Sequence, residues 1–361
     1  MTTQGTAPVP VLPQQVERFP STRYLGSKRR LLPFLHTVFS SLEFETAADP
    51  FCGTGAVAFL LKAMGRAVTA SDSLRWNAMC AEALLRNDGP AALPAMPSLL
   101  RGIPDPDAPA GFVERHFDGI FFEPEENRFI DQVRGRLRAM EPTAAAPLWY
   151  ALFQAALAKR PYNLFHRANL SLRRSDVRRS FGNKTTWDTP FPTLMERFAN
   201  EADGAVFRGE GAVTVRRADV DELDFSTFDL VYLDPPYMPS RGVGVDYADY
   251  YHFLEGLCLD DGEWEANLLP RYRHRPLRGR GTSLFCRPDT IGGAIAQLVA
   301  RIPGTVVISY RSDGIPSIEA LAAMLKRAGR RVEIRDAGSV HYALSTRRTP
   351  HEVALIGRPD S

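Results

Sequence analysis

The stretch that most constrains the fold is 230–237, which reads Leu-Val-Tyr-Leu-Asp-Pro-Pro-Tyr. Four apolar or aromatic residues in succession predict a buried strand, and the two prolines end it because proline cannot donate to a β-ladder. The strand should therefore deliver Asp234 to the carboxyl edge of a sheet, where open α/β sheets bind ligands. An Asp-Pro pair alone is an ordinary turn. The complete tetrad 234–237 adds a second proline and an aromatic ring.

These four residues suit a planar ring that carries an exocyclic amine. The carboxylate of Asp234 and the carbonyl of Pro235 can each accept one N–H, while Tyr237 stacks on the ring face. Pro236 stiffens the turn that holds them. A flipped adenine fits this description, and the sequence predicts Asp234, Pro235, Pro236 and Tyr237 as the catalytic residues.

Composition places few other limits on the chain. With 361 residues, of which 44% are hydrophobic, it can bury the core of a large α/β domain. It has no apolar run of about 18 residues and no secretion signal pattern, so we expect a cytoplasmic protein. The four cysteines are scattered without a CxxC pair, so neither a zinc site nor a disulfide framework is expected. His252 has no companion at ligand spacing, and we expect it to pack rather than to bind metal.

A second pattern, at 46–55, predicts the first βα unit of a nucleotide-binding half. Asp49 and Phe51 precede a turn with Gly53 and Gly55, and a helical pattern follows at 56–64. Small residues let a ligand approach the backbone, and the helix N-terminus favours negative charge. The G-x-G spacing without a following lysine excludes a P-loop and indicates a ligand other than a dinucleotide.

Two further strand ends carry carboxylates. The strand at 67–71 runs into Asp72, a position that offers a carboxylate to ribose hydroxyls, although a surface helix cap is the alternative. The strand at 212–216 is followed by Asp219, so several acceptors should lie along one rim of the sheet. Near the N-terminus, Tyr24 and Lys28 flank a glycine turn that precedes a short apolar helix at 31–35.

The remaining composition divides the chain into regions. We expect a disordered leader at 1–20, a catalytic domain made of 21–88 and 205–361, and a mainly helical insertion at 89–204. Residues 88–111, rich in Pro, Ala and Gly, are interpreted as a linker or long loop. The expected later elements are helices at 125–140, 148–158 and 318–328, a strand at 305–310, and a closing hairpin of 332–334 with 353–356.

Basic residues gather in two segments. Between 159 and 184 there are eight Lys or Arg and one acid, with Phe165, Phe181 and Trp187 interleaved, and 271–280 holds five arginines without an acid. Such segments are either solvated faces or contacts to a polyanion, and interleaved aromatics suit unstacked bases. The candidate DNA-binding residues are Arg167, Arg173, Arg174, Arg178, Arg179, Lys184, Arg275 and Arg278.

In the order of these motifs the chain resembles the D12-class, or Dam-like, adenine-specific DNA methyltransferases. The resemblance implies a Rossmann-like, S-adenosylmethionine-dependent methyltransferase sheet with a helical target-recognition insertion. The implied reaction transfers a methyl group to the N6 amine of a flipped adenine in duplex DNA, without a metal. The enzyme would act in a restriction-modification pair or as an orphan methylase, and a cognate restriction endonuclease is a candidate partner.

The resemblance also assigns residues to the donor. Tyr24 and Lys28 would contact its methionine end, Gly53 and Gly55 would cradle it, Asp72 would hold its ribose and Asp219 its adenine; Asp49 and Phe51 belong to the same loop. Tyr24 stands where relatives often have tryptophan. Two alternatives stay open: a methyltransferase acting on RNA or another nucleobase, and a catalytically silent DNA-binding protein on the same scaffold.

Overall fold

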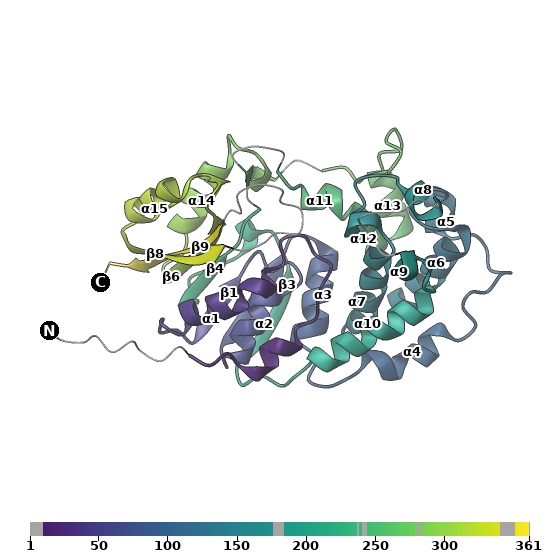
Figure 1. The fold of residues 1–361 in the computed structure, drawn as a ribbon, viewed down its shortest axis with the longest axis horizontal. Helices are drawn as coiled ribbons and strands as arrows, with labels where there is room; N and C mark the ends of the chain where they lie inside the picture. The colour runs from purple at the N-terminus through teal and green to yellow at the C-terminus, as the bar shows by residue number, and fades with distance from the viewer. Residues whose placement is uncertain are drawn as a thin grey trace.

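A seven-stranded sheet forms the centre of the molecule (Figure 1). The computed structural model describes residues 10–175, 184–236, 238–239, 244–279, 283–339 and 351–360. The strand order is β3-β2-β1-β4-β6-β9-β8, and β9 runs antiparallel to both of its neighbours. The strands are β1 (Thr46–Asp49), β2 (Ala67–Asp72), β3 (Val213–Arg217), β4 (Leu230–Leu233), β6 (Thr305–Arg311), β8 (Arg330–Ser339) and β9 (His351–Pro359). The parallel part of the sheet confirms the predicted Rossmann-like α/β class.

The alternation of side chains along the strands divides the core into two layers. In β4, Leu230 and Tyr232 face one hydrophobic cluster, and Val231 and Leu233 face the other. A strand that is apolar on both faces belongs in the middle of a sheet covered by helices on both sides. The helices are α1 (Leu32–Phe39), α2 (Ala56–Ala63) and α3 (Arg75–Leu85) in the first layer, and α14 (Ile291–Ala300) and α15 (Ile318–Arg327) in the second.

A lobe of helices lies beside the β3 edge of the sheet (Figure 1). It contains α4 (Ala92–Leu100), α5 (Phe112–Phe117), α6 (Pro124–Arg138), α7 (Pro142–Ala158), α8 (Leu170–Arg174), α9 (Lys184–Asp188) and α10 (Phe191–Ala205). Three later helices join this lobe: α11 (Tyr247–Tyr250), α12 (His252–Leu257) and α13 (Asp261–Asn267). Trp264 of α13 stacks on Phe112 of α5 at 4.5 Å, and Phe253 of α12 stacks on Phe165 at 4.9 Å. The lobe therefore draws on more of the chain than the predicted insertion, whose function as a unit stays a prediction.

The prediction of a linker or long loop at 88–111 is wrong for residues 92–100, which form α4. Pro94 lies in the first turn of this helix, where proline is tolerated. The carboxylate of Asp203, on α10, accepts hydrogen bonds from the backbone N–H groups of 91, 92 and 93 at 2.8 to 2.9 Å. These bonds satisfy the first amides of α4 from a residue more than a hundred positions away, which composition could not reveal.

Within the predicted leader, residues 10–20 also differ from expectation. Residues 14–18 form a short 3-10 helix, and Val16 and Phe19 are buried. Phe19 packs edge to face against Phe59 of α2 at 5.1 Å. Two apolar side chains in a segment rich in Pro and Gln are therefore enough to attach it to the core.

The predicted elements of the C-terminal part are confirmed: β6, α15, and the antiparallel pair β8 and β9. A small second sheet pairs β5 (Met238–Pro239) with β7 (Gly314–Ile315), just beyond the catalytic tetrad. Across the described ranges, no helix is both long enough and apolar enough to span a bilayer.

Candidate active site

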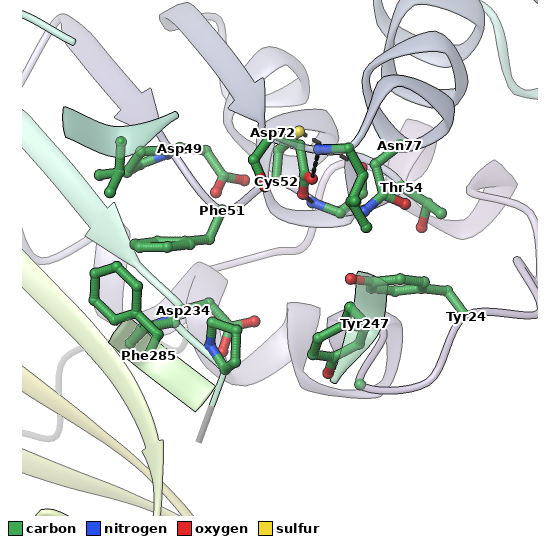
Figure 2. Close-up of a pocket in the computed structure, with 18 of the residues that line it drawn as sticks. Tyr24, Asp49, Phe51, Cys52, Thr54, Asp72, Asn77, Asp234, Tyr247 and Phe285 are labelled. Carbon is green, nitrogen blue, oxygen red and sulfur yellow. Dashed lines mark hydrogen bonds between the residues drawn. The ribbon is translucent and has the colours of Figure 1, made fainter. Parts of the chain in front are cut away.

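Asp234 directly follows β4 and points into a cavity at the carboxyl edge of the sheet (Figure 2). One of its carboxylate oxygens lies 2.7 Å from the ammonium nitrogen of Lys28, whose side chain is only 6% exposed. Burial raises the pKa of Asp234 to about 6, and the Lys28 charge acts against this rise. The resemblance placed Lys28 at the methionine end of the donor, but the structure brings its ammonium group to Asp234. Pro235 and Pro236 line the same cavity, and Tyr237 lies outside the described residues.

The loop after β1 forms the opposite wall. Gly53 and Gly55 have positive φ angles of 52° and 87°, and Gly55 is the N-cap of α2. A Cβ atom on Gly53 would lie 2.7 Å from the ring of Tyr24, so the loop needs glycine for close approach as well as for its backbone angle. Phe51 also lines the cavity, where its ring meets that of Phe285 edge to face at 5.1 Å.

Asp72, at the end of β2, fixes the shape of this loop. Its carboxylate accepts the backbone N–H of Gly53 at 3.0 Å and that of Leu74 at 2.9 Å. Burial raises its pKa to about 6, which these hydrogen bonds partly counteract. The side chain of Asn77, fully buried in the first turn of α3, lies beside both Asp72 and Tyr24. Burial raises the pKa of both groups, and the Asn77 contact acts against that rise. Asp72 is therefore a buried acceptor inside the cavity rather than a surface helix cap.

Asp49 adds a third carboxylate to the same rim. Burial raises its pKa well above the usual range, and the charges of Asp234 and Asp72 raise it further. Its Oδ1 atom is buried and has no hydrogen-bond partner in the described part of the chain. Asp219 follows β3 and lines the cavity as well. The four aspartates that the sequence predicted at strand ends thus meet in one cavity.

An aromatic wall closes the cavity on the side of the helical lobe. Tyr24 stacks on Tyr247 at 5.3 Å and on Tyr251 at 5.4 Å, and the Tyr251 hydroxyl accepts the backbone N–H of Leu25 at 2.7 Å. Trp76 packs behind them against Tyr251 at 4.8 Å. The wall joins the start of the chain to α11 and α12, which follow the catalytic tetrad.

The cavity contains about 1070 Å³ of space, including the part open to solvent. The lining combines several carboxylates with aromatic rings, so it suits a ligand that carries hydroxyl and N–H donors, a positive charge and a flat ring. Sequence reasoning missed Asn77, Tyr247 and Phe285. Only Asn77 had a local signal, because it lies one helical turn beyond the Asp72 strand end.

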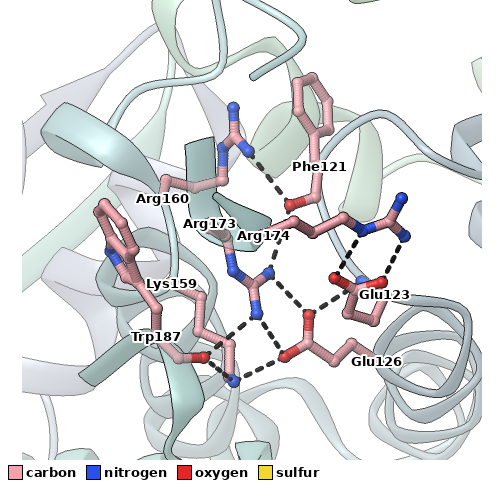
Figure 3. A network of polar contacts seen from close by, with 8 residues as sticks. All are labelled: Phe121, Glu123, Glu126, Lys159, Arg160, Arg173, Arg174 and Trp187. Atoms are coloured by element: carbon pink, nitrogen blue, oxygen red, sulfur yellow. Dashed lines mark hydrogen bonds and ion pairs between the residues drawn. The ribbon is translucent and has the colours of Figure 1, made fainter. Parts of the chain in front are cut away.

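Part of the first basic segment is buried, and this part does not have the role predicted for it (Figure 3). Arg173 was expected to bind DNA, but it is buried, and its guanidinium contacts both carboxylate oxygens of Glu126 at 2.7 and 2.8 Å. Lys159 is buried too and lies 2.6 Å from Glu126. Arg160 is fully buried and donates to the carbonyl of Phe121. Glu126 and the carbonyls of neighbouring helix ends compensate these charges, so Arg173 cannot reach phosphates.

The aromatics of that segment also differ from expectation, because Phe165 and Trp187 are buried and cannot stack on bases. Arg174 is half exposed and forms an ion pair with Glu123. Arg167 and Lys184 are exposed, and Lys184 lies 3.3 Å from Asp188. Phe181, Arg178 and Arg179 lie outside the described residues. Arg278 is exposed and Arg275 partly exposed, so Arg167, Lys184, Arg275 and Arg278 stay candidates for DNA contact.

His252 packs as predicted. It is fully buried, its Nε2 atom lies 3.1 Å from the carbonyl of Phe165, and burial lowers its pKa to about 3. The four cysteines are unpaired. Within the described ranges, no group of three or more His, Cys, Asp or Glu side chains is arranged to hold a metal ion.

Comparison with known proteins agrees with this geometry. Type II methyltransferase M2.HphI of Haemophilus parahaemolyticus is 25% identical over 355 residues, which cover 94% of this chain and 94% of the relative. Type II methyltransferase M.FokI of Planomicrobium okeanokoites is 29% identical over 102 residues, or 28% of this chain and 14% of the relative. The family of D12 class N6 adenine-specific DNA methyltransferases matches residues 24–256, which contain the Gly53 loop, the helices α4 to α10 and the tetrad 234–237. The chain belongs to this family and is an adenine-specific DNA methyltransferase that takes a methyl group from a bound donor.

Proposed function

We propose that the protein is a site-specific methyltransferase of a restriction-modification system, with S-adenosylmethionine as donor and a flipped adenine of duplex DNA as acceptor. The observation that carries the proposal is that Asp234 shares one cavity with the Gly53 loop and Asp72. A base held at Asp234 and a donor held at the loop would therefore face each other. The relatives' description as Type II methyltransferases supports a partner endonuclease that cleaves the same sequence.

The lining of the cavity fits this donor. S-adenosylmethionine carries two ribose hydroxyls, an ammonium group and a sulfonium centre, and the rim offers the carboxylates of Asp49, Asp72 and Asp219. The unpartnered Oδ1 atom of Asp49 is an acceptor suited to such a donor group. The absence of a side chain on Gly53 lets the Tyr24 ring lie directly against the loop, so an aromatic face and the loop belong to the same wall. We assign Tyr24, Phe51, Gly53 and Gly55 to the donor site as well.

When bound, the donor supplies a methyl group that is already activated by the positive sulfur. The chain's own residues mainly align the acceptor, which is catalysis by proximity. Asp234 and the Pro235 carbonyl each accept one N–H of the adenine amine, which makes the nitrogen more nucleophilic and stabilises the positive charge that develops on it. Extrusion of the base costs a few kcal/mol. Stacking on Tyr237, worth roughly 1 to 3 kcal/mol per base, offsets much of that cost.

The Lys28 contact gives Asp234 a second function in the absence of DNA. Its carboxylate is paired with a buried cation before the amine arrives. Replacement of Asp234 by alanine would leave a buried ammonium group without this partner, which is costly. Asparagine keeps an acceptor for Lys28 while it removes the charge, so Asp234→Asn is the cleaner test.

The test measures single-turnover methylation of duplex DNA, donor affinity by calorimetry and thermal unfolding. Asp234→Asn is expected to lower the methylation rate at least about a hundredfold, the scale of one preorganised electrostatic contact, with donor affinity little changed. Asp224→Asn, at an exposed aspartate, is the matched control. An Asn variant that methylates adenine at nearly the wild-type rate would contradict the role of Asp234. Wild-type transfer to RNA but not to duplex DNA would contradict the proposed substrate.

The pH dependence gives a second measurement on the same proteins. Only the ionised carboxylate can accept a hydrogen bond from the amine and also stabilise the positive charge that develops on it. Burial raises the pKa of Asp234 in the free enzyme to about 6. The value of kcat/KM should therefore fall as the pH drops through about 6, since this ratio reports groups of the free enzyme. The residual activity of Asp234→Asn should lose the part of this acidic limb that Asp234 contributes, while Asp72, whose pKa burial also raises to about 6, still contributes its own part.

A further inference from the structure

Residues 267–278 form a short antiparallel hairpin that projects beyond α13 (the green loop above it in Figure 1). We call it the arginine hairpin. Leu268 pairs with Leu277, the backbone N–H of Leu269 donates to the carbonyl of Pro276 at 2.9 Å, and that of Arg278 donates to the carbonyl of Asn267 at 2.8 Å. The hairpin lies beyond residue 256, where the family match ends. It is therefore a feature that the family comparison does not explain.

The arginine hairpin is strongly basic, and in the described part of the chain no carboxylate pairs with its arginines. It contains Arg271, Arg273, Arg275, Arg278 and His274, and no acidic residue. Among the described residues, no carboxylate lies within 4.0 Å of any of its four arginines, although α13 before it is acidic. Arg271 and Arg273, near the tip, are exposed. The guanidinium of Arg271 lies over the ring of Tyr272 at 4.9 Å, which orders it without neutralising it.

One side of the hairpin, with His274 and Pro276, is fixed to the elements that surround the cavity. Pro276 is buried, and the ring of His274 lies 5.6 Å from that of His252. The Nε2 atom of His274 lies 3.7 Å from a carboxylate oxygen of Asp249, which is on α11. Tyr247, two residues before Asp249, lines the cavity. A fixed side and an exposed tip are the properties of an element that positions side chains on a partner.

The chain itself limits how far the hairpin can lie from the site. Ser283 lines the cavity, and five residue steps separate it from Arg278. Five extended residues reach at most roughly 18 Å. This is about half of the roughly 34 Å helical turn of DNA. Arg278 therefore lies within about half a turn of the cavity lining, and the tip of the hairpin, which extends further along the paired strands, lies within about one turn.

We propose that the arginine hairpin enters the major groove beside the target adenine, and that Arg271 and Arg273 read base edges there and so determine part of the recognised sequence. The inference rests on the proposed placement of the target adenine at Asp234. The major groove admits a two-stranded β-ribbon, and arginine pairs bidentately with the O6 and N7 atoms of guanine. The expected partner is thus at least one guanine within about one turn of the methylated adenine.

The test separates base reading from charge. Arg271→Lys and Arg273→Lys keep the positive charge but lose the bidentate fork, while Arg271→Ala and Arg273→Ala lose both. Each variant and the wild type select bound duplexes from a randomised pool, which are then sequenced. The same proteins methylate genomic DNA, which is read by methylation-sensitive sequencing. Arg327→Lys, at an exposed arginine of α15 on the far side of the sheet, is the control.

The lysine variants are expected to lose preference at one or two base positions by about tenfold, while their salt dependence of binding stays near that of the wild type. The alanine variants should lose the same preference and also bind more weakly. A uniform loss of affinity with an unchanged base preference, or no change at all, would overturn the inference. If the wild type methylates no adenine, the proposed function fails, and the selection of bound duplexes still decides the role of the hairpin.

Discussion

The two basic segments of this chain are alike in composition and opposite in environment. Around Lys159, Arg160 and Arg173, buried cations converge on Glu126 and on carbonyl groups (Figure 3). In the arginine hairpin, the arginines at the tip face solvent and have no carboxylate partner in the described part of the chain. The buried part of the first segment holds the helical lobe together, and we propose that the second segment contacts DNA.

The difference lies in two glutamates at the start of α6. Glu123 and Glu126 form the capping box of that helix, so the residues that satisfy its first amides also receive Arg173 and Arg174. Glu126 lies 47 positions from Arg173, outside any local window of sequence. A count of arginines therefore indicates nucleic-acid binding only where no acidic helix start lies against them.

Removal of Arg173 should give the largest effect. Arg173→Met is expected to lower the free energy of unfolding by about 3 kcal/mol or more, because it breaks a buried ion pair with Glu126. Arg174→Met, on the next residue but in an exposed pair, should lower the free energy of unfolding far less, because solvent screens that pair. Urea unfolding of both proteins measures the difference. Equal, small losses would mean that the buried network does not hold the lobe.

Neutralisation of Arg275 and Arg278 should affect DNA binding instead of stability. If both contact phosphates, the double substitution Arg275→Gln with Arg278→Gln should reduce the slope of log affinity against log salt by about 1.8. Arg173→Met should leave that slope unchanged at a temperature where it is folded. The measurement is fluorescence anisotropy with a duplex at several salt concentrations. An unchanged slope in the hairpin variant would contradict the assignment of these two arginines.

The smallest expected effect is the pH dependence of the stability that Glu126 gives to the first segment. Burial acts to raise the pKa of Glu126, but Arg173 and Lys159 outweigh it and hold that pKa below the usual range. A lowered folded pKa stabilises the protein above the ordinary glutamate value of about 4.3 and ceases to do so as the pH falls below it. The difference in the free energy of unfolding between the wild type and Glu126→Gln should therefore decrease as the pH falls from 6 to 3.5. A difference that stays constant would mean that the charge of Glu126 contributes nothing.

The aspartates at the carboxyl edge of the sheet were predictable because each is marked by a local sequence pattern. Each of Asp49, Asp72 and Asp234 ends a short apolar strand, and a parallel sheet brings such ends to one edge. The fold class followed from the same strands. The aromatic wall was not predictable in this way. Tyr24 and Tyr247 are far apart in the chain, and no local sequence pattern indicates that their rings stack.

The predictions that were wrong also depend on contacts between residues that are far apart in the chain. The α4 helix depends on Asp203, and the burial of Arg173 depends on Glu126, so both are decided by tertiary contacts that override composition. The contact between Lys28 and Asp234 was missed for the same reason, since each residue was assigned to a different ligand. Sequence patterns located the groups that carry the chemistry, and the structure showed which of them neutralise each other.

The hydrogen bond from the Leu25 amide to the Tyr251 hydroxyl spans 226 residues, and this has a consequence for synthesis. A ribosome that adds roughly 5 to 20 residues per second needs roughly 10 to 45 s to make that interval. During this time the residues around Tyr24 have been made, but the rings that will stack on them have not. No nascent chain that stops before Tyr251 can complete the wall of the cavity, so the capacity to enclose a donor arrives late in translation.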